Sequence, residues 1–174
     1  MAKRMAFSAI LIALAVVCLY GATIAPSAKI SLLALTSVFG AVSVAEYGPK
    51  YGVTHYVGVS LLSLLLIPSK MLVIVYIIFL GYYPVVKTFI ERIGKRWLEW
   101  IVKIAVFNLF LIIGYFVFKA FFLPSIESAV VDLALKYLPW VILALEVIFV
   151  LYDYILSYII TYYYKVLQVK IHGR

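Results

Sequence analysis

Charged residues are scarce in this sequence, and acidic residues are the scarcest. Only 7 of the 174 residues are Asp or Glu, and charged residues make up 13% of the chain, against about 25% in soluble domains. Apolar and aromatic residues make up 67%, a share too large for one buried core. This composition excludes an ordinary water-soluble fold, a disordered chain and a fibrous repeat. It predicts an all-α, polytopic membrane protein.

Residues that carry catalysis or bind metals are equally rare. The single cysteine, Cys18, lies inside an apolar run, and the only histidines are His55 and His172, so we expect no intramolecular disulfide and no metal. There is no glycine-rich phosphate loop, no H-E-x-x-H and no G-x-S-x-G motif, so we expect neither a cofactor nor enzyme activity. Active transport would then require an ion gradient or a separate motor subunit. His55, beside Tyr51 and Tyr56, is interpreted as an interface histidine.

Long apolar runs fill the chain from end to end. A spanning helix needs about 20 apolar residues. Because proline cannot donate to a helix interior, the prolines help to divide the runs, and only Pro84 lies well inside one. This division predicts a single domain over residues 1–174, a bundle of six transmembrane helices. The expected runs are Met5–Ile24, Ile30–Ala45, Tyr51–Ile67, Met71–Val86, Ile101–Phe122 and Leu138–Tyr164.

Several features leave the number of spans open. The second and fourth runs are short, and Pro68, Ser69 and Lys70 give the chain little length in which to reverse direction. Four or five spans with a re-entrant segment are the alternative to six. Lys3 and Arg4 before the first run are also found in secretory signals. A run of about 20 residues exceeds the usual signal core of about 7–15, so we expect an uncleaved first span.

Basic residues are distributed unequally over the two sides of the expected bundle. Lys and Arg number 15, and most lie between the apolar runs, where they meet lipid headgroups rather than nucleic acid. Counted from the N-terminus, eleven fall on the first side and four on the second. Because basic loops face the cytoplasm, both termini are expected inside (N-in/C-in) in a multi-pass protein of the cell membrane. The four on the second side are Lys29, Lys70, Lys119 and Lys136.

Two groups of residues are expected near the cytoplasmic interface. The interval between the fourth and fifth runs contains Arg92, Lys95 and Arg96, which form either a headgroup anchor or a docking site for a partner. The tyrosines that become denser toward the end of the sixth run are interpreted as an interfacial aromatic belt, because rings with a polar tip prefer that depth.

Each of the last three runs carries a stripe of polar residues spaced seven and four apart, so that they share a helix face. The stripes are Tyr76, Tyr83 and Lys87, then Asn108, Tyr115 and Lys119, then Glu146, Asp153 and Ser157. An ionised acid near the bilayer centre costs about 2.5–3.5 kcal/mol, so the sixth run needs neighbours inside the bundle. The stripes predict either a polar cavity between the three helices or interhelical hydrogen bonds worth about 0.6 kcal/mol each.

Depth along the helices selects the candidate ligand residues. Glu146 lies in the outer half of the sixth run and Lys119 near the outer end of the fifth, so both are expected to face an outward-open pocket. Trp140, two turns before Glu146, is either an apolar wall of that pocket or an interfacial anchor. Asp153 is expected to pair internally with Lys103 or Asn108, unless either acid is held protonated. The candidate ligand-binding set is completed by Asn108, Tyr115 and Tyr76.

The first run carries small residues at helical spacing. In its stretch AFSAILIALAVV, Ala9 and Ala13 lie four apart on one face, where small side chains let another helix approach closely. That helix belongs either to a partner or to this chain. With six spans and two cytoplasmic ends, this alanine-x-x-x-alanine pattern resembles the substrate-capture subunits (S components) of energy-coupling-factor vitamin transporters.

This resemblance implies a function and partners. In S components the alanine face docks on a transmembrane coupling subunit driven by cytoplasmic ATPases, and the vitamin binds in the outer half. We therefore expect a membrane transport subunit that captures a small, vitamin-like organic solute from outside and depends on a partner for energy. One alternative is a non-transporting scaffold or accessory subunit of a larger membrane complex, whose basic loop recruits a partner. Another is a small ion-coupled carrier in which Asp153 titrates.

Overall fold

The computed structural model describes residues 2–121 and 128–168, and within these ranges all regular structure is helical. The main helices are α1 (Ala2–Ile24), α2 (Lys29–Tyr47), α3 (Pro49–Leu66), α4 (Lys70–Val75), α5 (Tyr83–Ile90), α6 (Arg96–Phe121) and α7 (Ser128–Tyr162). The short 3-10 or π segments are η1 (Pro26–Ala28), η2 (Tyr76–Leu80), η3 (Glu91–Ile93) and η5 (Tyr163–Gln168). Phe122, the expected end of the fifth run, and the basic residues Lys170 and Arg174 lie outside the described residues, as does the side chain of Lys136.

Five helical stretches are long and apolar enough to cross a membrane. The prediction of an all-helical chain with several helices long and apolar enough to span a membrane is therefore confirmed for the described residues. The third expected run forms α3, 18 residues long, but Lys50, His55, Ser60 and Ser63 make it more polar than the five. The five stretches are Lys3–Ile24, Lys29–Tyr47, Lys70–Ile93, Arg96–Phe121 and Tyr137–Lys165.

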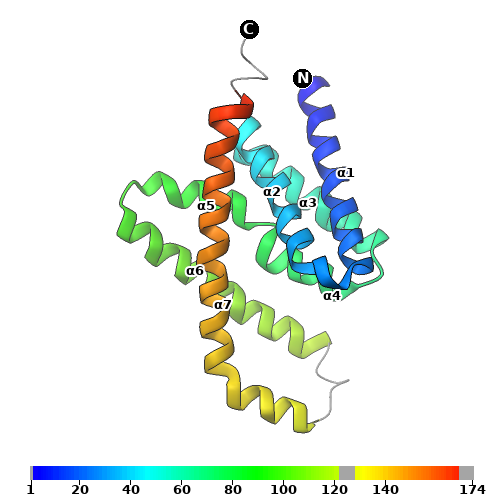
Figure 1. Cartoon of the computed structure of the whole chain (residues 1–174), viewed down its shortest axis with the longest axis vertical. Coiled ribbons are helices and arrows are strands. Elements are labelled where there is room, and N and C mark those ends of the chain that lie inside the picture. Colours follow the sequence, from blue (N-terminus) through cyan, green and yellow to red (C-terminus); the bar gives the residue numbers. More distant parts are fainter. Residues whose placement is uncertain (1, 122–127, 169–174) are drawn as a thin grey trace.

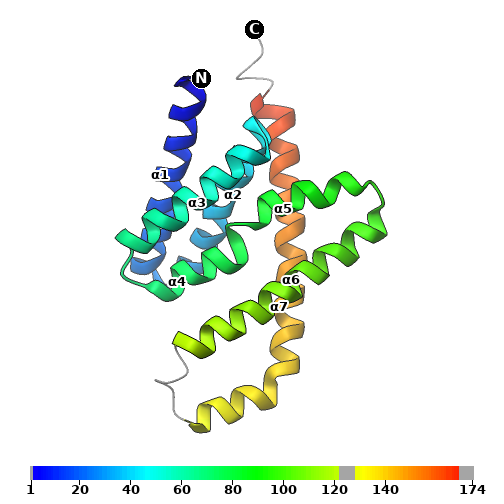
Figure 2. The same ribbon diagram turned by 180° about the vertical axis from the view of Figure 1, so that it is seen from behind.

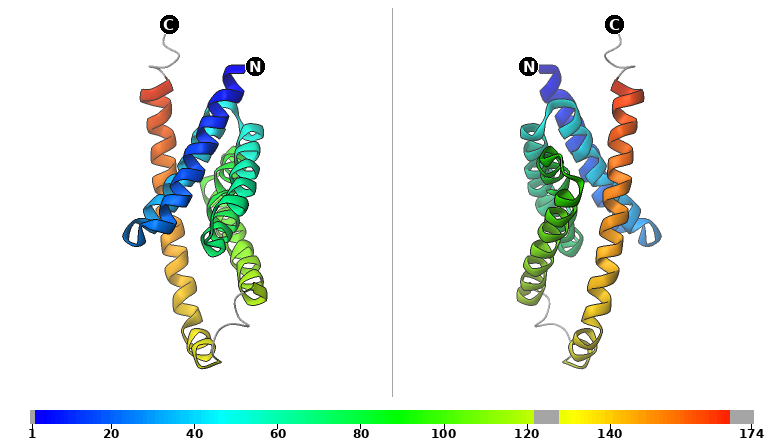
Figure 3. Two further views of the ribbon diagram at one scale, coloured as in Figure 1. Left: turned by 90° about the vertical axis from the view of Figure 1, so that its right-hand side faces the viewer. Right: turned by 90° about the vertical axis from the view of Figure 1, so that its left-hand side faces the viewer.

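Helix α2 lies at the centre of the bundle. It packs against α1, α3, α5 and α7, and α1 also packs against α3. The later half of α6 and the first half of α7 continue past the ends of α1–α4 (Figures 1, 2 and 3). The first turn of α1 and the last turn of α7 lie at the same end of the molecule (Figure 1).

Two clusters of buried apolar side chains hold the helices together. The first joins α1, α2, α3 and α4 through residues such as Leu19, Leu33 and Val59. The second joins α2, α5, α6 and α7, and it is mostly aromatic. Phe107 of α6 stacks on Phe149 of α7 with ring centroids 4.2 Å apart. This second cluster is the packing against which the polar residues of α5, α6 and α7 are placed.

The fourth expected run is not one continuous α-helix. Helix α4 passes into the π segment η2, the chain bends at Gly81 and Tyr82, and α5 begins with Pro84 in its first turn. Proline is favoured there because it has no N–H to donate, and its fixed φ suits a helix start. The Tyr56 hydroxyl donates to the Ile77 carbonyl oxygen at 3.2 Å, which satisfies part of the interrupted backbone.

Gly81 is required at this bend by close packing. A Cβ added there would lie 2.7 Å from Cδ2 of Tyr56 and 2.8 Å from Cζ of Tyr76, so two tyrosine rings cover the glycine. Broken helices are tolerated at membrane depth where protein buries them. The bend gives α5 its own direction, and α5 carries Tyr83 and Lys87.

The interpretation of His55 as an interface histidine is wrong. Its side chain is buried on α3, and a Cβ added at Gly40 of α2 would lie 3.4 Å from its Cδ2. Neither ring nitrogen has a hydrogen-bond partner among the described residues. The histidine faces α2 because the third run buries one face against that helix, with Gly52, Val59 and Ser63 on the same side.

Gly52 on α3 offers a direct test of this packing. A Cβ there would lie 2.2 Å from Cγ2 of Val44 on α2 and 2.9 Å from Cγ2 of Val85 on α5. We expect Gly52→Ala to lower stability by about 1–3 kcal/mol, measured as thermal unfolding in mild detergent. Gly21→Ala is the control, since its Cβ would meet Leu32 at an ordinary 3.6 Å. Equal stability of the two variants would contradict the close approach of α2, α3 and α5.

Candidate functional site

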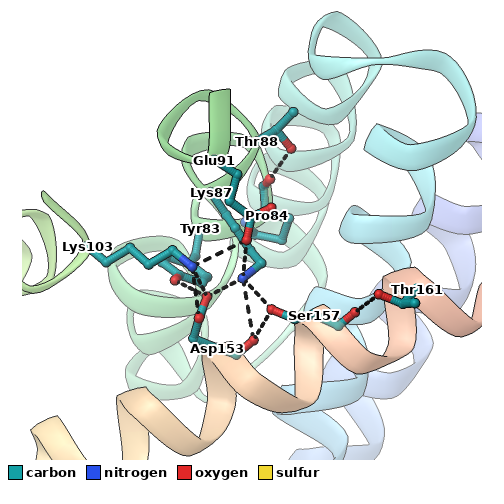
Figure 4. Close-up of polar contacts among 9 residues, drawn as sticks. All are labelled: Tyr83, Pro84, Lys87, Thr88, Glu91, Lys103, Asp153, Ser157 and Thr161. Atoms are coloured by element: carbon teal, nitrogen blue, oxygen red, sulfur yellow. Dashed lines mark hydrogen bonds and ion pairs between the residues drawn. The ribbon is translucent and has the colours of Figure 1, made fainter. Parts of the chain in front are cut away.

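A group of charged side chains lies buried where α5, α6 and α7 meet (Figure 4). Asp153 of α7 is 3% exposed, Lys87 of α5 is 1% exposed and Lys103 of α6 is 5% exposed. Lys103 Nζ lies 2.9 Å from Oδ2 of Asp153, and Lys87 Nζ forms an ion pair with Oδ1 of the same carboxylate. Two lysines from two helices therefore share one acid on a third.

Neighbouring groups complete the hydrogen bonding of these charges. The Tyr83 hydroxyl donates to Oδ1 of Asp153 at 2.6 Å. Lys87 Nζ donates to Oγ of Ser157 at 2.7 Å, and that hydroxyl donates to the Asp153 carbonyl oxygen at 2.8 Å. Glu91 Oε1 lies 2.8 Å from Lys87 Nζ and 3.3 Å from Lys103 Nζ. We call these six residues the charge cluster.

The charge cluster is electrically balanced. Lys87 and Lys103 supply two positive charges, and Asp153 and Glu91 supply two negative charges. A buried ion is costly unless it is paired and its remaining hydrogen bonds are satisfied, and both conditions are met here. Glu91 differs from the other charged members because its side chain is 44% exposed, so it forms the edge of the cluster.

Helical spacing explains how the cluster assembles. Tyr83, Lys87 and Glu91 follow one another at intervals of four and therefore line one face of α5 and η3. Asp153 and Ser157 have the same spacing on α7. The sequence places Tyr83, Lys87, Asp153 and Ser157 on polar stripes, but it does not show that Lys87 joins the Asp153 pair. Glu91 follows Lys87 by four residues, and this spacing is the sequence feature that would have added Glu91 to the stripe of Tyr83 and Lys87.

A second polar site lies in a cleft of about 310 Å³ between α6 and α7. Asn108 Nδ2 donates to Oε1 of Glu146 at 3.2 Å and to the Ile104 carbonyl oxygen at 3.0 Å. Phe107 and Phe149 lie in the cleft wall, and Phe149 also packs edge-on against Tyr83 with centroids 5.1 Å apart. These rings therefore lie between the cleft and the charge cluster. The lining residues are Ile104, Phe107, Leu143, Glu146, Val147, Phe149, Val150 and Leu151.

The structure brings together some of the expected ligand residues and separates others. Glu146 and Asn108 meet at the cleft. Trp140 is 70% exposed, and neither it nor the exposed Tyr115 and Lys119 lines the cleft. These three side chains belong to the outward faces of α6 and α7.

Tyr76 and the expected internal pair lie away from the cleft. Tyr76 is buried in the first apolar cluster, among helices α1 to α4, and its hydroxyl has no partner among the described residues. Of the two partners considered for Asp153, Lys103 forms the pair, whereas Asn108 bonds to Glu146.

The expected docking residues are all on the surface. Ala9 and Ala13 are exposed on α1, on the face that also presents Met5, Ile10 and Val17. Arg92, Lys95 and Arg96 are exposed at the turn between α5 and α6, where Gly94 has φ +73°. Both surfaces are therefore accessible to a partner or to lipid.

The tyrosines at the end of α7 divide into two groups. Tyr154 and Tyr158 are exposed, as residues of an aromatic belt would be. Tyr163 is buried and donates to Oε2 of Glu46 at 2.6 Å, and Tyr164 donates to the Ala45 carbonyl oxygen at 2.9 Å. The belt interpretation is wrong for Tyr163, because its hydroxyl joins η5, which directly follows α7, to the end of α2.

Among the residues that the structure describes, no three His, Cys, Asp or Glu side chains are placed to hold a metal ion. Comparison with known proteins found no matching family model, no similar curated protein and no similar solved structure. The chemistry of the charge cluster and of the α6–α7 cleft is therefore the basis for a functional proposal.

Removing Asp153 tests whether the charge cluster stabilises the bundle. Asp153→Asn leaves two buried ammonium groups with Glu91 alone, and we expect a loss of about 3–5 kcal/mol in thermal unfolding. The double variant Lys87→Met, Asp153→Asn restores charge balance between Lys103 and Glu91 and is expected to recover part of the loss. Additive effects of the two substitutions would contradict the coupling.

Proposed function

We propose that this chain is a membrane transport subunit that captures a small organic solute from the outer side and depends on a partner for energy. The observation that supports it is the open α6–α7 cleft, where apolar side chains flank Glu146. Its volume of about 310 Å³ fits the lower end of the range for small-molecule sites, about 300–1,000 Å³. Apolar walls with a few placed polar groups are typical of such sites.

The charge cluster supports the same proposal. Broken helices are a common feature of solute sites in secondary transporters, and α5 is the second half of a helix broken at Gly81 and Tyr82. Asp153 links α5 to α6 and α7, the two helices that form the cleft. Phe149 lines the cleft and packs against Tyr83 of α5, so a solute in the cleft would contact a ring that touches α5.

We propose six spans with both termini in the cytoplasm as the topology of this subunit. Helix α3 turns back from α2 at Gly48, packs on α1 and α2, and with 18 residues is about 27 Å long, close to the thickness of the hydrocarbon core. Counting α3 as a span agrees with the placement of the first turn of α1 and the last turn of α7 at one end (Figure 1).

Cysteine labelling tests this topology. In a Cys18→Ala background, Lys50→Cys places a single exposed thiol in the first turn of α3, and Pro68→Cys places one just beyond its last residue. We expect a membrane-impermeant maleimide to label Pro68→Cys in intact cells and Lys50→Cys only after permeabilisation. Equal labelling of the two positions would show that α3 does not cross the membrane.

A partner would dock on the exposed alanine face of α1. Small residues allow close helix approach, which drives association in lipid where hydrophobic attraction between helices is absent. We expect the double variant Ala9→Phe, Ala13→Phe to lose a membrane partner that co-purifies with the wild-type chain in mild detergent. Both residues are exposed, so folding should be unaffected. Leu61→Phe, at an exposed position on α3, is the matched control.

The competing candidate is a non-transporting scaffold whose basic turn recruits the partner. The exposure of Arg92, Lys95 and Arg96 favours it, as does the mutual satisfaction of the groups in the charge cluster. It requires that charge reversal of these three residues, rather than the alanine substitutions, releases the partner, and that no solute is bound.

A further inference from the structure

The charge of Glu146 has no positive partner among the described residues. In the cleft it is the only charged lining residue, and its side chain receives a hydrogen bond from the neutral amide of Asn108. Asp153 and Glu91 are the acids that pair with the buried Lys87 and Lys103. Glu146 is thus an acid at membrane depth that is not neutralised by a lysine or arginine of the described chain.

The lysines that could have neutralised it are placed elsewhere. Lys119, on the same helix as Asn108, is exposed and does not line the cleft. Lys87 and Lys103 are buried nearby, but both are held by Asp153 and Glu91, and the stacked rings of Phe107 and Phe149 lie between them and the cleft. The cleft therefore has negative character and apolar walls.

We propose that the solute captured in this cleft is an amphipathic organic cation, whose positive charge pairs with Glu146 while its apolar body lies against Phe107 and Val147. This inference rests on the proposed capture function. Away from water, a charged group requires an opposite charge and hydrogen bonds, and a bound ammonium group supplies both to Glu146. A carboxylate solute would be repelled, and a neutral one would leave the acid unpaired.

Three probes that share a phenyl group on a four-carbon chain, and differ in the charge of the other end, test the proposal. They are 4-phenylbutylamine, 4-phenylbutan-1-ol and 4-phenylbutyrate, measured by equilibrium dialysis against the full chain in phosphatidylcholine nanodiscs, with empty nanodiscs to correct for partition into lipid. We expect saturable binding of the amine. Binding of the alcohol and of the carboxylate should be weaker by about tenfold or more.

Substitutions assign the binding to the cleft. Glu146→Gln keeps the size of the side chain and is expected to weaken amine binding by about thirtyfold or more. Lys119→Ala changes an exposed residue of α6, the helix that faces Glu146 across the cleft, and should leave amine binding unchanged. Val150→Trp fills the cleft and should abolish binding even if the glutamine variant proves unstable. Amine binding that is insensitive to Glu146→Gln and Val150→Trp would overturn the site.

Mass spectrometry of small molecules released from the gently extracted protein tests the cation inference separately from the capture function. A released organic cation supports both. A released neutral or anionic solute, or probe binding independent of charge, overturns the cation inference and leaves the capture function standing. No released solute together with no binding of any probe overturns the capture function itself.

Discussion

The sharing of one buried carboxylate by two lysines is the interaction on which the arrangement of α5, α6 and α7 depends. Asp153 is the point where these three helices meet, because Lys87 and Lys103 reach it from separate helices. In hydrocarbon, apolar packing gives little net attraction between helices, since lipid tails are as apolar as leucine. Polar contacts that cannot be replaced by lipid therefore decide which helices stay together and in what register.

The broken fourth run and the cleft both lie next to this junction. Lys87 reaches Asp153 from α5, the short helix that starts after the bend at Gly81. Helices α6 and α7 are then fixed near the cluster, while beyond it they leave the cleft that holds Glu146. A rigid polar anchor and a neighbouring apolar cleft are thus built from the same two helices.

Composition and periodicity predict the fold class well and the side-chain partners less well. The apolar runs correspond to helices, and the spacing of seven between Glu146 and Asp153 places both acids toward α6. The sequence could not show that Lys119 is exposed, because the spacing of polar residues along one helix does not indicate how far that helix extends beyond its neighbours. Similarly, Pro84 predicts an interruption, but the direction of α5 depends on tertiary packing around Gly81.

The partial exposure of Glu91 divides the charge cluster into two electrostatic environments. Dissolved salt screens charges that are in contact with water, over a Debye length of about 8 Å at physiological ionic strength, and buried pairs are screened much less. The contacts of Glu91 with Lys87 and Lys103 are therefore sensitive to the ionic composition at that surface, whereas those of Asp153 are shielded from it. The turn between α5 and α6 can loosen in concentrated electrolyte while the junction of the three helices persists.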